Sequence, residues 1–289
     1  MSAPRASSAA LAGRVALVTG ASRGLGLAIA RRLAAHGLRV LLLASPRSQE
    51  ALSRAVAQIV AAGGQAAAVV ADLADPAARA GLIARAEGLL GPVDILVNNA
   101  AGISAYAPPS RIDRGARQAM WELNLEAPID LTQQALPGMR ARGWGRIVNL
   151  SSEMARQPPI PYPGPAKFVH ALALYGVSKA ALERYTEALA AELQGSGLTA
   201  NALYPHKIAL TEGAEAVARQ TAVQHPDWLE PVELVAEAAW LLIVGGQSGT
   251  VASSRAILQR AQAPLHALDG VTVIGDATTL ATLPPPHRG

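Results

Sequence analysis

The chain has 289 residues, of which 51% are hydrophobic, and it contains no cysteine. This length fits one or two domains, and α/β folds often fill it with a single one. The absence of cysteine excludes a disulfide framework, a thiolate nucleophile and a cysteine-ligated metal site. The net charge is +4, but the arginines are scattered and aromatic residues make up only 3% of the chain, which disfavours nucleic-acid binding.

The first residues differ in composition from the rest of the chain. Residues 1–13 are rich in alanine and serine and contain no acid, which predicts a flexible leader, with a transit peptide as the alternative. No segment offers the run of about 18 apolar residues that a membrane span needs. We therefore expect a soluble, cytoplasmic protein that does not contact a membrane.

Strand-like and helix-like segments alternate along the chain. Short apolar runs predict strands over Val15–Thr19, Val40–Ala44, Ala66–Ala71, Asp94–Val97, Arg146–Leu150 and Thr199–Leu203. Helical spacing predicts helices over Leu27–His36, Ser48–Ala62, Pro76–Leu90, Arg117–Arg142, Leu174–Gln194 and Pro231–Val244. This alternation predicts a Rossmann-type, doubly wound parallel sheet covered on both faces, a three-layer α/β/α sandwich in one domain over residues 1–289.

Two regions interrupt the alternation. Residues 156–170 are rich in proline, so this insert forms neither a regular helix nor a central strand. Residues 261–289 form an irregular tail that ends in prolines. The last strand of the sheet falls either at Gly249–Val251 or at Val271–Ile274.

A glycine-rich turn follows the first predicted strand and precedes a helix. Side chains at its glycines would obstruct the turn or the approach of a pyrophosphate to backbone N–H groups at the helix N-terminus. The turn therefore predicts a dinucleotide cofactor. Its predicted contacts are Gly20, Ser22, Arg23, Gly24, Leu25 and Gly26.

The end of the second strand predicts which dinucleotide binds. A carboxylate there accepts a hydrogen bond from the ribose 2′-hydroxyl of NAD and would repel the 2′-phosphate of NADP. Here the strand is followed by Ser45, and no acid appears before Glu50, while Arg47 and Arg23 supply positive charge. The sequence favours NADP, with NAD as the alternative.

Further cofactor contacts are expected after the third and fourth strands, on the ligand side of an open sheet. They are Asp72, Leu73, Asn98, Asn99 and Ala100. Asp72 and Leu73 lie where an adenine would bind. Asp72 is alternatively a cap for the helix that begins near Pro76.

Tyr175 and Lys179 are spaced i, i+4 and share one face of a predicted helix. An unperturbed tyrosine titrates near pH ~10, too high for a base at neutral pH, but a nearby ammonium favours the phenolate and lowers this pKa. A tyrosine tuned in this way can serve as a general acid/base. The spacing alone is weak evidence, because many surface helices contain it.

Several motifs together resemble those of the short-chain dehydrogenase/reductase family. They are Thr-Gly-x-x-x-Gly-x-Gly over residues 19–26, Asn-Asn-Ala over 98–100, Asn-x-x-Ser over 149–152 and Tyr-x-x-x-Lys over 175–179. They occur in the order of the family, and the match runs from Val15 to about Leu258. Jointly the motifs are highly specific.

The resemblance implies a role for each matching residue. Tyr175 would exchange a proton with the substrate oxygen, and Lys179 would hold the nicotinamide ribose and lower the tyrosine pKa. Ser152 would bind the substrate carbonyl; we choose it over Ser151 because it is fourth in its motif. Asn124 matches the helix asparagine that holds a water in the proton relay, and the alternative is a polar residue satisfied within its helix.

The chain departs from the family pattern in the loops around the expected cleft. Gly102 lies one position later than the glycine of the fourth-strand motif. After the sixth strand His206 replaces a glycine and the loop is one residue longer, while Ile208 and Thr211 are kept as expected cofactor contacts. The proline-rich insert lengthens the Ser-to-Tyr spacing, so we expect it near the substrate cleft, with a surface excursion or subunit contact as the alternative.

The sequence therefore predicts an NAD(P)-dependent oxidoreductase that transfers a hydride between nicotinamide and a carbonyl or secondary alcohol, with tyrosine as general acid/base. The alternatives are a non-catalytic NADP-binding regulator and an epimerase or dehydratase on the same fold. The expected partner is a small-molecule carbonyl or alcohol, and no metal is expected. The resemblance implies a homodimer or homotetramer packed through the helices around Asn124 and Tyr175.

Overall fold

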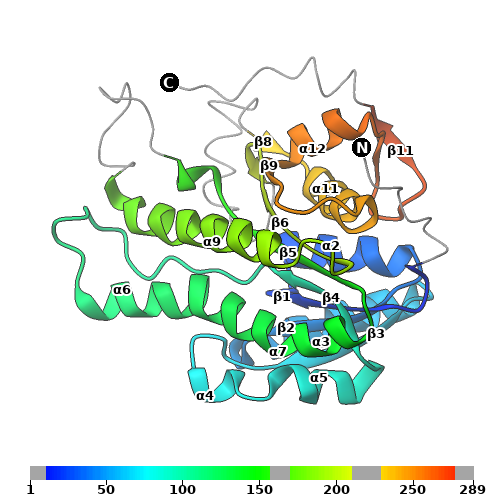
Figure 1. Cartoon of the computed structure of the whole chain (residues 1–289), viewed down its shortest axis with the longest axis horizontal. Helices are drawn as coiled ribbons and strands as arrows, with labels where there is room; N and C mark the ends of the chain where they lie inside the picture. The colour runs from blue at the N-terminus through cyan, green and yellow to red at the C-terminus, as the bar shows by residue number, and fades with distance from the viewer. Residues whose placement is uncertain (1–10, 157–169, 210–228, 277–289) are drawn as a thin grey trace.

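The computed structural model describes residues 11–156, 170–209 and 229–276, and a parallel sheet of seven strands runs through its centre (Figure 1). The strands are β1 (Val15–Thr19), β2 (Arg39–Ala44), β3 (Gln65–Val70), β4 (Val93–Asn98), β5 (Gly145–Leu150), β6 (Leu198–Tyr204) and β9 (Val251–Ser253). Their order is β3-β2-β1-β4-β5-β6-β9. The chain thus winds outward twice from the centre, and the predicted doubly wound α/β fold is confirmed.

The strands occupy the middle of the molecule because their residues are apolar in continuous runs. Every residue of β1, β4 and β5 is buried. Parallel strands that are covered on both faces need such runs, whereas strands with one wet face alternate apolar and polar residues. The edge strand β3 is more exposed than these central strands.

Helices cover both faces of this sheet (Figure 1). One face carries α2 (Gly24–Ala35), α3 (Gln49–Ala61) and α11 (Val232–Gly245), with α12 (Ser254–Ala261) packed on α11. The opposite face carries α5 (Leu82–Leu90), α7 (Ala127–Ala141) and α9 (Ala173–Glu192), with α4 (Pro76–Arg79) beside α7 and α6 (Arg114–Trp121) beside α9. Two separate apolar cores result, one on each side of the sheet.

Two of the predicted helices are interrupted. The helix predicted over Pro76–Leu90 is two helices, because Gly81 adopts a left-handed conformation with φ of 63° between α4 and α5. The helix predicted over Arg117–Arg142 is divided by a π-helical turn, η2 (Glu122–Glu126), between α6 and α7. Single π-helical turns are frequent at functional sites, and Asn124 lies in this one.

The last strand of the sheet is β9, which pairs in parallel with β6. Of the two alternatives for this strand, the one at Gly249–Val251 is confirmed, although the strand itself begins at Val251. Two small sheets lie outside the main one: β7 (Ile208–Ala209) pairs with β8 (Leu229–Glu230), and β10 (Leu265–His266) pairs with β11 (Val273–Gly275). The alternative at Val271–Ile274 therefore belongs to a separate antiparallel hairpin.

A buried ion pair anchors this hairpin to the helices. Arg32 of α2 and Glu237 of α11 lie 2.8 Å apart, and both side chains are almost fully buried. Glu237 also contacts the ring of His266 at 3.0 Å, and Arg32 donates to the His266 carbonyl oxygen at 2.8 Å. The described part of the tail, residues 261–276, is therefore more regular than the sequence predicts.

Residues 11–13, predicted as the end of a flexible leader, are packed against the body instead. Leu11 is buried, and the N–H of Gly13 donates to the carbonyl oxygen of Gly37 at 2.9 Å. Residues 1–10 lie outside the described residues. The flexible leader predicted over residues 1–13 therefore extends too far, because the apolar side chain of Leu11 packs in the core.

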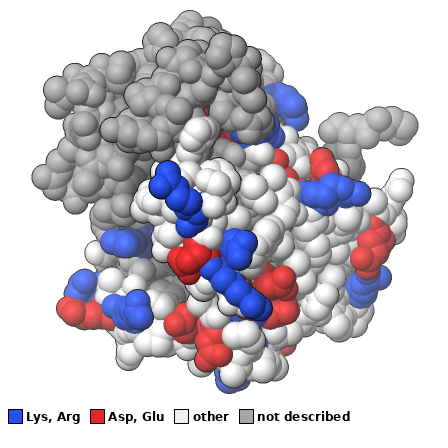
Figure 2. All heavy atoms as spheres, turned by 90° about the vertical axis from the view of Figure 1, so that its left-hand side faces the viewer, with Lys and Arg blue, Asp and Glu red and all other residues white. Residues whose placement is uncertain are grey.

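The surface drawn in Figure 2 carries both signs of charge. Lys and Arg side chains lie interspersed with Asp and Glu side chains on this face. A nucleic-acid site needs basic side chains gathered in a patch or stripe, so this face is unlike one. Within the described ranges, no helix combines the length and apolar character needed to cross a membrane.

Candidate active site

A cleft of about 1130 Å³ opens at the carboxyl ends of the parallel strands, the edge where ligands bind in open α/β sheets. Most site residues predicted from the sequence line this cleft. They are Gly20, Ser22, Arg23, Gly24, Leu25, Ser45, Arg47, Asp72, Leu73, Asn99, Ala100, Ser152, Tyr175 and Ile208. Gly26, Asn98, Asn124 and Lys179 are buried and do not line the cleft, and Thr211 lies outside the described residues.

The glycine-rich turn packs too closely for side chains. Gly20 has a φ of 64°, and a Cβ atom there would crowd the side chain of Asn99 and the backbone of Ala100. A Cβ atom at Gly26 would overlap the carbonyl oxygen of Gly20. The turn leaves a cradle at the N-terminus of α2, where backbone N–H groups and the helix dipole suit a pyrophosphate. The residues present therefore fit a dinucleotide.

Replacing Gly26 with alanine is expected to weaken NADPH binding by about tenfold or more. The new methyl group must displace the Gly20 carbonyl, and overpacking of this kind costs about 1–3 kcal/mol. Fluorescence titration with NADPH measures the loss. The matched control is Gly88→Ala in α5, where a Cβ atom meets nothing within 4 Å. The control should keep wild-type affinity, and equal affinity in both variants would contradict the prediction.

Thr19 and Asn99 join this turn to the end of β4. The Thr19 hydroxyl accepts hydrogen bonds from the backbone N–H groups of Asn99 and Ala100, both at 2.9 Å. The Asn99 amide donates to the carbonyl oxygens of Thr19 at 2.8 Å and Gly20 at 3.3 Å. The phosphate turn and the β4 end thus form one rigid unit.

Asn98, predicted as a cofactor contact, has a different place. Its side-chain amide is buried and donates to Oδ1 of Asn149 on β5 at 2.8 Å and to the hydroxyl of Thr132 on α7 at 3.4 Å. Asn149 in turn donates to the hydroxyl of Thr186 on α9 at 2.8 Å. The Asn98 side chain therefore ties the sheet to its helices and does not reach the cleft.

Positive charge gathers where β2 ends. Arg47 lies in the short helical turn η1 (Pro46–Ser48), Arg23 lies on the glycine-rich turn, and both line the cleft with Ser45. Two guanidinium groups and a hydroxyl are suitable partners for a 2′-phosphate, because arginine binds phosphate oxygens through paired N–H donors.

Asp72 lines the cleft beside this end and does not cap the following helix. Its carboxylate accepts a hydrogen bond from the N–H of Ala74 at 3.0 Å. The cap of α4 is Asp75, which accepts from the N–H of Ala77 at 2.9 Å. The alternative of Asp72 as helix cap is therefore wrong.

Tyr175 and Ser152 lie together at the other end of the cleft. Ser152 precedes the short helical turn η3 (Glu153–Ala155), and Tyr175 lies in the first turn of α9. A Cβ atom at Gly176 would overlap the carbonyl oxygen of Met154, so this glycine lets α9 approach η3 closely. Burial raises the pKa of Tyr175, and its hydrogen bond with Ser152 acts in the opposite direction. The phenol therefore keeps its proton at neutral pH.

The Ser151 side chain does not face the cleft. Its hydroxyl donates to a carboxylate oxygen of Glu183 on α9 at 2.7 Å, and it does not line the cleft. Ser152 does line the cleft, and its hydroxyl accepts from the N–H of Met154 at 3.2 Å. The geometry therefore favours Ser152 over Ser151 as the serine that meets a substrate.

Lys179 is buried one helical turn beyond Tyr175. Its Nζ donates to the carbonyl oxygen of Leu150 at 2.7 Å and lies 5.9 Å from the centre of the Tyr175 ring. Burial lowers the pKa of Lys179 to about 8, and the negative charge of Glu183 partly opposes this shift. The sequence predicts that Lys179 lowers the pKa of Tyr175, but in the structure burial raises this pKa, and the opposing effect comes from the hydrogen bond with Ser152.

Asn124 is fully buried in the π-helical turn η2. Its side-chain oxygen accepts from the N–H of Gly102 at 2.9 Å, and its amide donates to the Gly102 carbonyl at 3.0 Å and the Ser178 hydroxyl at 3.1 Å. Gly102 is the glycine that is displaced by one position from the family pattern. Asn124 therefore binds the shifted loop to the helix that carries Tyr175 and Lys179.

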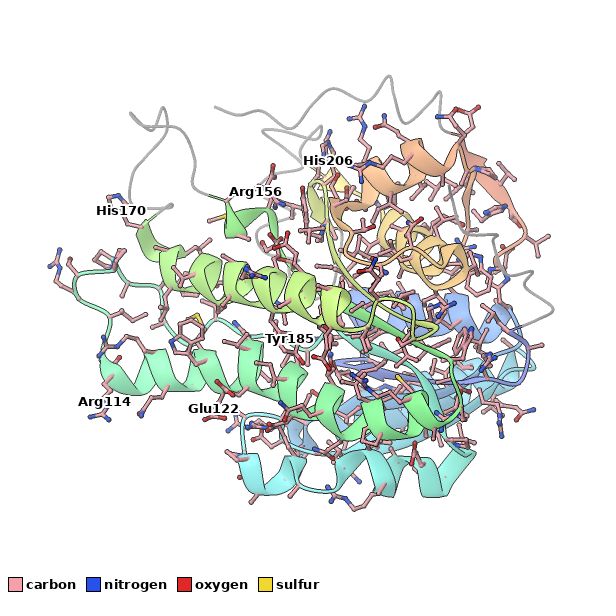
Figure 3. The ribbon with its side chains drawn as sticks, viewed as in Figure 1. Arg114, Glu122, Arg156, His170, Tyr185 and His206 are labelled. Carbon is pink, nitrogen blue, oxygen red and sulfur yellow. The ribbon has the colours of Figure 1, made fainter. Side chains whose placement is uncertain are left out.

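The proline-rich insert begins at the end of η3 and rejoins the described chain at His170, before α9 (Figure 3). Arg156, at its first position, stacks over the ring of Tyr204 with 4.3 Å between the guanidinium carbon and the ring centre. Met154, two residues earlier, lines the cleft. The remainder of the insert, residues 157–169, lies outside the described residues. The expected contact of the insert with substrate therefore stays a prediction.

The loop after β6 borders the cleft through Pro205, Lys207 and Ile208. His206, which replaces a family glycine, needs no left-handed backbone, since Gln262 is the one non-glycine residue with positive φ in the described ranges. The carboxylate of Glu230 accepts hydrogen bonds from the backbone of this loop. No sequence motif marks Glu230, so its role was not predicted.

Arg79 is a second buried charge that the sequence analysis missed. Its guanidinium group donates to the carbonyl oxygen of Leu73, which lines the cleft, at 2.7 Å. It also contacts Asp130 at 2.6 Å and Glu122 at 2.8 Å. Arg79 therefore links the expected adenine end of the cleft to the π-helical turn.

The fold and this cleft define a dinucleotide-binding oxidoreductase of the Rossmann type, and comparisons with known proteins give its family. A sequence model described as short chain dehydrogenase matches residues 14–222. The ketoacyl reductase HetN of Nostoc sp. is 35% identical over 201 residues, which cover 70% of this chain and 66% of HetN. The gluconate 5-dehydrogenase of Gluconobacter oxydans is 35% identical over 222 residues, 76% of this chain and 79% of that enzyme.

A solved structure agrees with these relatives. A short chain dehydrogenase from Burkholderia cenocepacia in complex with NADP superimposes with a TM-score of 0.72 at 33% identity. The superposition covers 84% of this chain and 96% of that one. The chain belongs to the short-chain dehydrogenase/reductase family.

Proposed function

We propose that this protein is an NADP-preferring oxidoreductase that interconverts a small carbonyl compound and a secondary alcohol. The observation that carries the proposal is that Tyr175 and Ser152 line the same cleft as the glycine-rich turn. A proton donor and a phosphate cradle are thus parts of one site. The NADP complex of the Burkholderia cenocepacia structure and the arginines near Ser45 support the choice of NADP.

The cofactor, when bound, supplies or accepts a hydride at the nicotinamide ring. The chain supplies the matching proton. The Ser152 hydroxyl binds the substrate oxygen and holds it beside the phenol of Tyr175. Tyr175 gives its proton to this oxygen during reduction and takes it back during oxidation. The raised pKa of Tyr175 suits the reductive direction, because the phenol is protonated at neutral pH.

Lys179 is proposed to hold the nicotinamide ribose, as the family resemblance implies. An ammonium group has three N–H donors, and the Leu150 carbonyl accepts one of them. With a pKa of about 8, the amino group is mostly charged at neutral pH. A compact ammonium fits this buried position better than the broad, planar fork of an arginine.

Asn124 is proposed to act as a positioning residue. Both N–H donors of its side-chain amide are already used, one by Gly102 and one by Ser178. Its side chain is therefore satisfied, but by partners outside the helix that the alternative assumed. The amide has no free N–H donor for a relay water, and the side chain holds the Gly102 loop against α9.

A panel of carbonyl compounds and alcohols, assayed with both cofactors, tests the proposed function. The panel includes ketoacyl substrates and gluconate, because two relatives are named for them. We expect at least one carbonyl compound to be reduced with NADPH at a higher kcat/KM than with NADH. NADPH binding without oxidation of NADPH by any member of a broad panel would instead indicate a non-catalytic regulator.

A further inference from the structure

A buried carboxylate holds the loop that follows β6. Glu230 is 3% exposed, its Oε1 accepts from the backbone N–H of His206 at 3.1 Å, and its Oε2 accepts from the N–H of Lys207 at 3.2 Å. The hydroxyl of Ser254, at the start of α12, donates to Oε1 at 3.1 Å and accepts from the His206 N–H at 3.1 Å. Two successive backbone N–H groups form a concavity that suits an anion, and here the carboxyl group of Glu230 occupies it.

This loop lies at the reacting end of the cleft. Pro205, Lys207 and Ile208 line the cleft, as do Tyr175 and Ser152. A dinucleotide crosses a doubly wound sheet at the point where the strand order reverses, here between β1 and β4. The adenine half then lies over β2 and β3, and the nicotinamide half lies over β5 and β6. The loop after β6 therefore borders the nicotinamide half.

The groups that face Glu230 come from two segments. The loop contributes His206 and Lys207, and α12 contributes Ser254 and Arg255. Figure 3 shows His206 between the end of β6 and α12. Burial lowers the pKa of His206 to about 4, so its ring is neutral at neutral pH. Burial also raises the pKa of Glu230 to about 8, against the opposing effects of Ser254, the two N–H groups and Lys207.

The sequence explains why this loop needs an anchor. The loop is one residue longer than the family pattern, and His206 stands where the family has a glycine. Glu230 is also the last residue of β8, and the register of β8 with β7 pairs it with Ala209, the residue that follows the loop. Glu230 thus fixes the loop at its backbone N–H groups and at its exit.

We propose that Glu230 is a positioning residue that sets the shape of the 205–208 loop and thereby the affinity for the nicotinamide half of the cofactor. The inference rests on the proposed function only in its choice of NADP as the bound molecule. Its readout is binding and not turnover. If the wild type binds NADPH but reduces no carbonyl, the proposed function fails and the role of Glu230 stands.

The test compares Glu230→Gln with the wild type near pH 9, where the carboxylate is ionised. Glutamine keeps the shape but replaces one acceptor oxygen with an NH₂ group, so one loop N–H loses its hydrogen bond to residue 230. We expect NADPH affinity to fall about tenfold, in the range for a lost hydrogen bond to a charged group. Affinity for 2′,5′-ADP, which carries only the adenine half, should stay unchanged. Unchanged NADPH affinity, or an equal loss for both ligands, overturns the proposal.

Glu237→Gln is the matched control for the loss of a buried carboxylate. Glu237 is 2% exposed, pairs with Arg32 and lies outside the cleft lining. Its variant should melt at a lower temperature yet bind NADPH like the wild type. If Glu230→Gln does not fold, Ser254→Ala replaces it, since it removes a hydroxyl that bridges Glu230 and His206. It should show the same selective loss for NADPH, smaller in size, and an unselective loss overturns the proposal.

The pH dependence gives a readout that a merely structural role would not move. The ionised carboxylate accepts from both N–H groups, whereas a protonated carboxyl group gives up one acceptor. The ratio of wild-type to Glu230→Gln affinity for NADPH should therefore grow as pH rises through about 8. Lys179, with a pKa also of about 8, titrates in both proteins and cancels in the ratio. A ratio that stays flat or falls overturns the proposal.

Discussion

Replacing Tyr175 with phenylalanine is expected to lower kcat for carbonyl reduction by about 10²–10⁴-fold, the usual contribution of a positioned general acid. The phenol is buried next to Ser152, and burial raises its pKa, so it carries the proton that the substrate oxygen needs. Phenylalanine preserves the ring and its packing but has no proton to donate. Steady-state kinetics at saturating NADPH should show the loss in kcat and in kcat/KM alike, as for an interaction made only in the transition state.

Tyr185→Phe provides the matched control on the same helix. The pKa of Tyr185 is also raised by burial, but its hydroxyl bonds to Thr132 and the residue does not line the cleft. We expect this variant to keep full turnover with a small loss of thermal stability. Tyr175→Phe should still bind NADPH with wild-type affinity. If Tyr175→Phe turned over at a rate close to that of the wild type, the phenol of Tyr175 would not be the proton donor.

The phosphate turn was predictable because its physical requirements are local. A left-handed backbone at Gly20 and a close approach at Gly26 are conditions that glycine alone meets without strain, so residue type reveals geometry there. The sheet was predictable for a related reason. Continuous apolar runs such as Val15–Thr19 have few uses other than a strand buried on both faces.

Neighbouring positions at a strand end were harder to separate. Asn98 and Asn99 belong to one motif, but consecutive side chains of an extended chain point in opposite directions. Asn99 meets the phosphate turn, while Asn98 faces Asn149 and Thr132 inside the protein. Only the pairing of β4 with its neighbours decides which of the two reaches the cleft, and a single sequence does not contain that register.

Buried charges were the least predictable part of the site. An arginine or glutamate is expected at the surface unless its partner is known, because burying an unpaired charge is costly. The partners of Arg79 lie 43 and 51 positions away, and Glu230 binds a loop 24 positions before it. The place of Asn124 is similar, since its side-chain oxygen accepts from the N–H of Gly102, 22 positions earlier.

Removing both arginines at the adenine end is expected to erase the preference for NADPH over NADH. Each hydrogen bond to a charged group contributes about 1.5–3 kcal/mol, so losing Arg23 and Arg47 together should lower the kcat/KM ratio of NADPH to NADH by about 10²-fold or more. The value of kcat/KM should fall for NADPH and stay unchanged for NADH, because NADH has no 2′-phosphate. Kinetics of Arg23→Ala/Arg47→Ala with both cofactors measures it.

Arg31→Ala controls for the loss of positive charge from a nearby element, the helix α2 that follows the glycine-rich turn. Arg31 of α2 donates to Gln58 at 2.5 Å and lies outside the cleft lining, so its removal should leave the cofactor ratio unchanged. If the double variant kept the wild-type ratio of kcat/KM for NADPH to NADH, other groups would bind the 2′-phosphate, or NAD would be the cofactor.

The salt dependence of KM shows whether the preference for NADPH over NADH rests on charge or on the shape of the cleft. Two guanidinium groups at a cleft open to solvent act on a 2′-phosphate through an interaction that ions screen, with a Debye length of about 10 Å at 0.1 M salt. The KM of the wild type for NADPH should therefore rise with ionic strength more steeply than its KM for NADH. In Arg23→Ala/Arg47→Ala the steeper rise for NADPH should disappear, because the two positive charges that attract the 2′-phosphate are gone, while the carboxylate of Asp72 that remains beside them repels it. Parallel slopes in the wild type would mean that the cleft selects its cofactor by fit and not by the arginines.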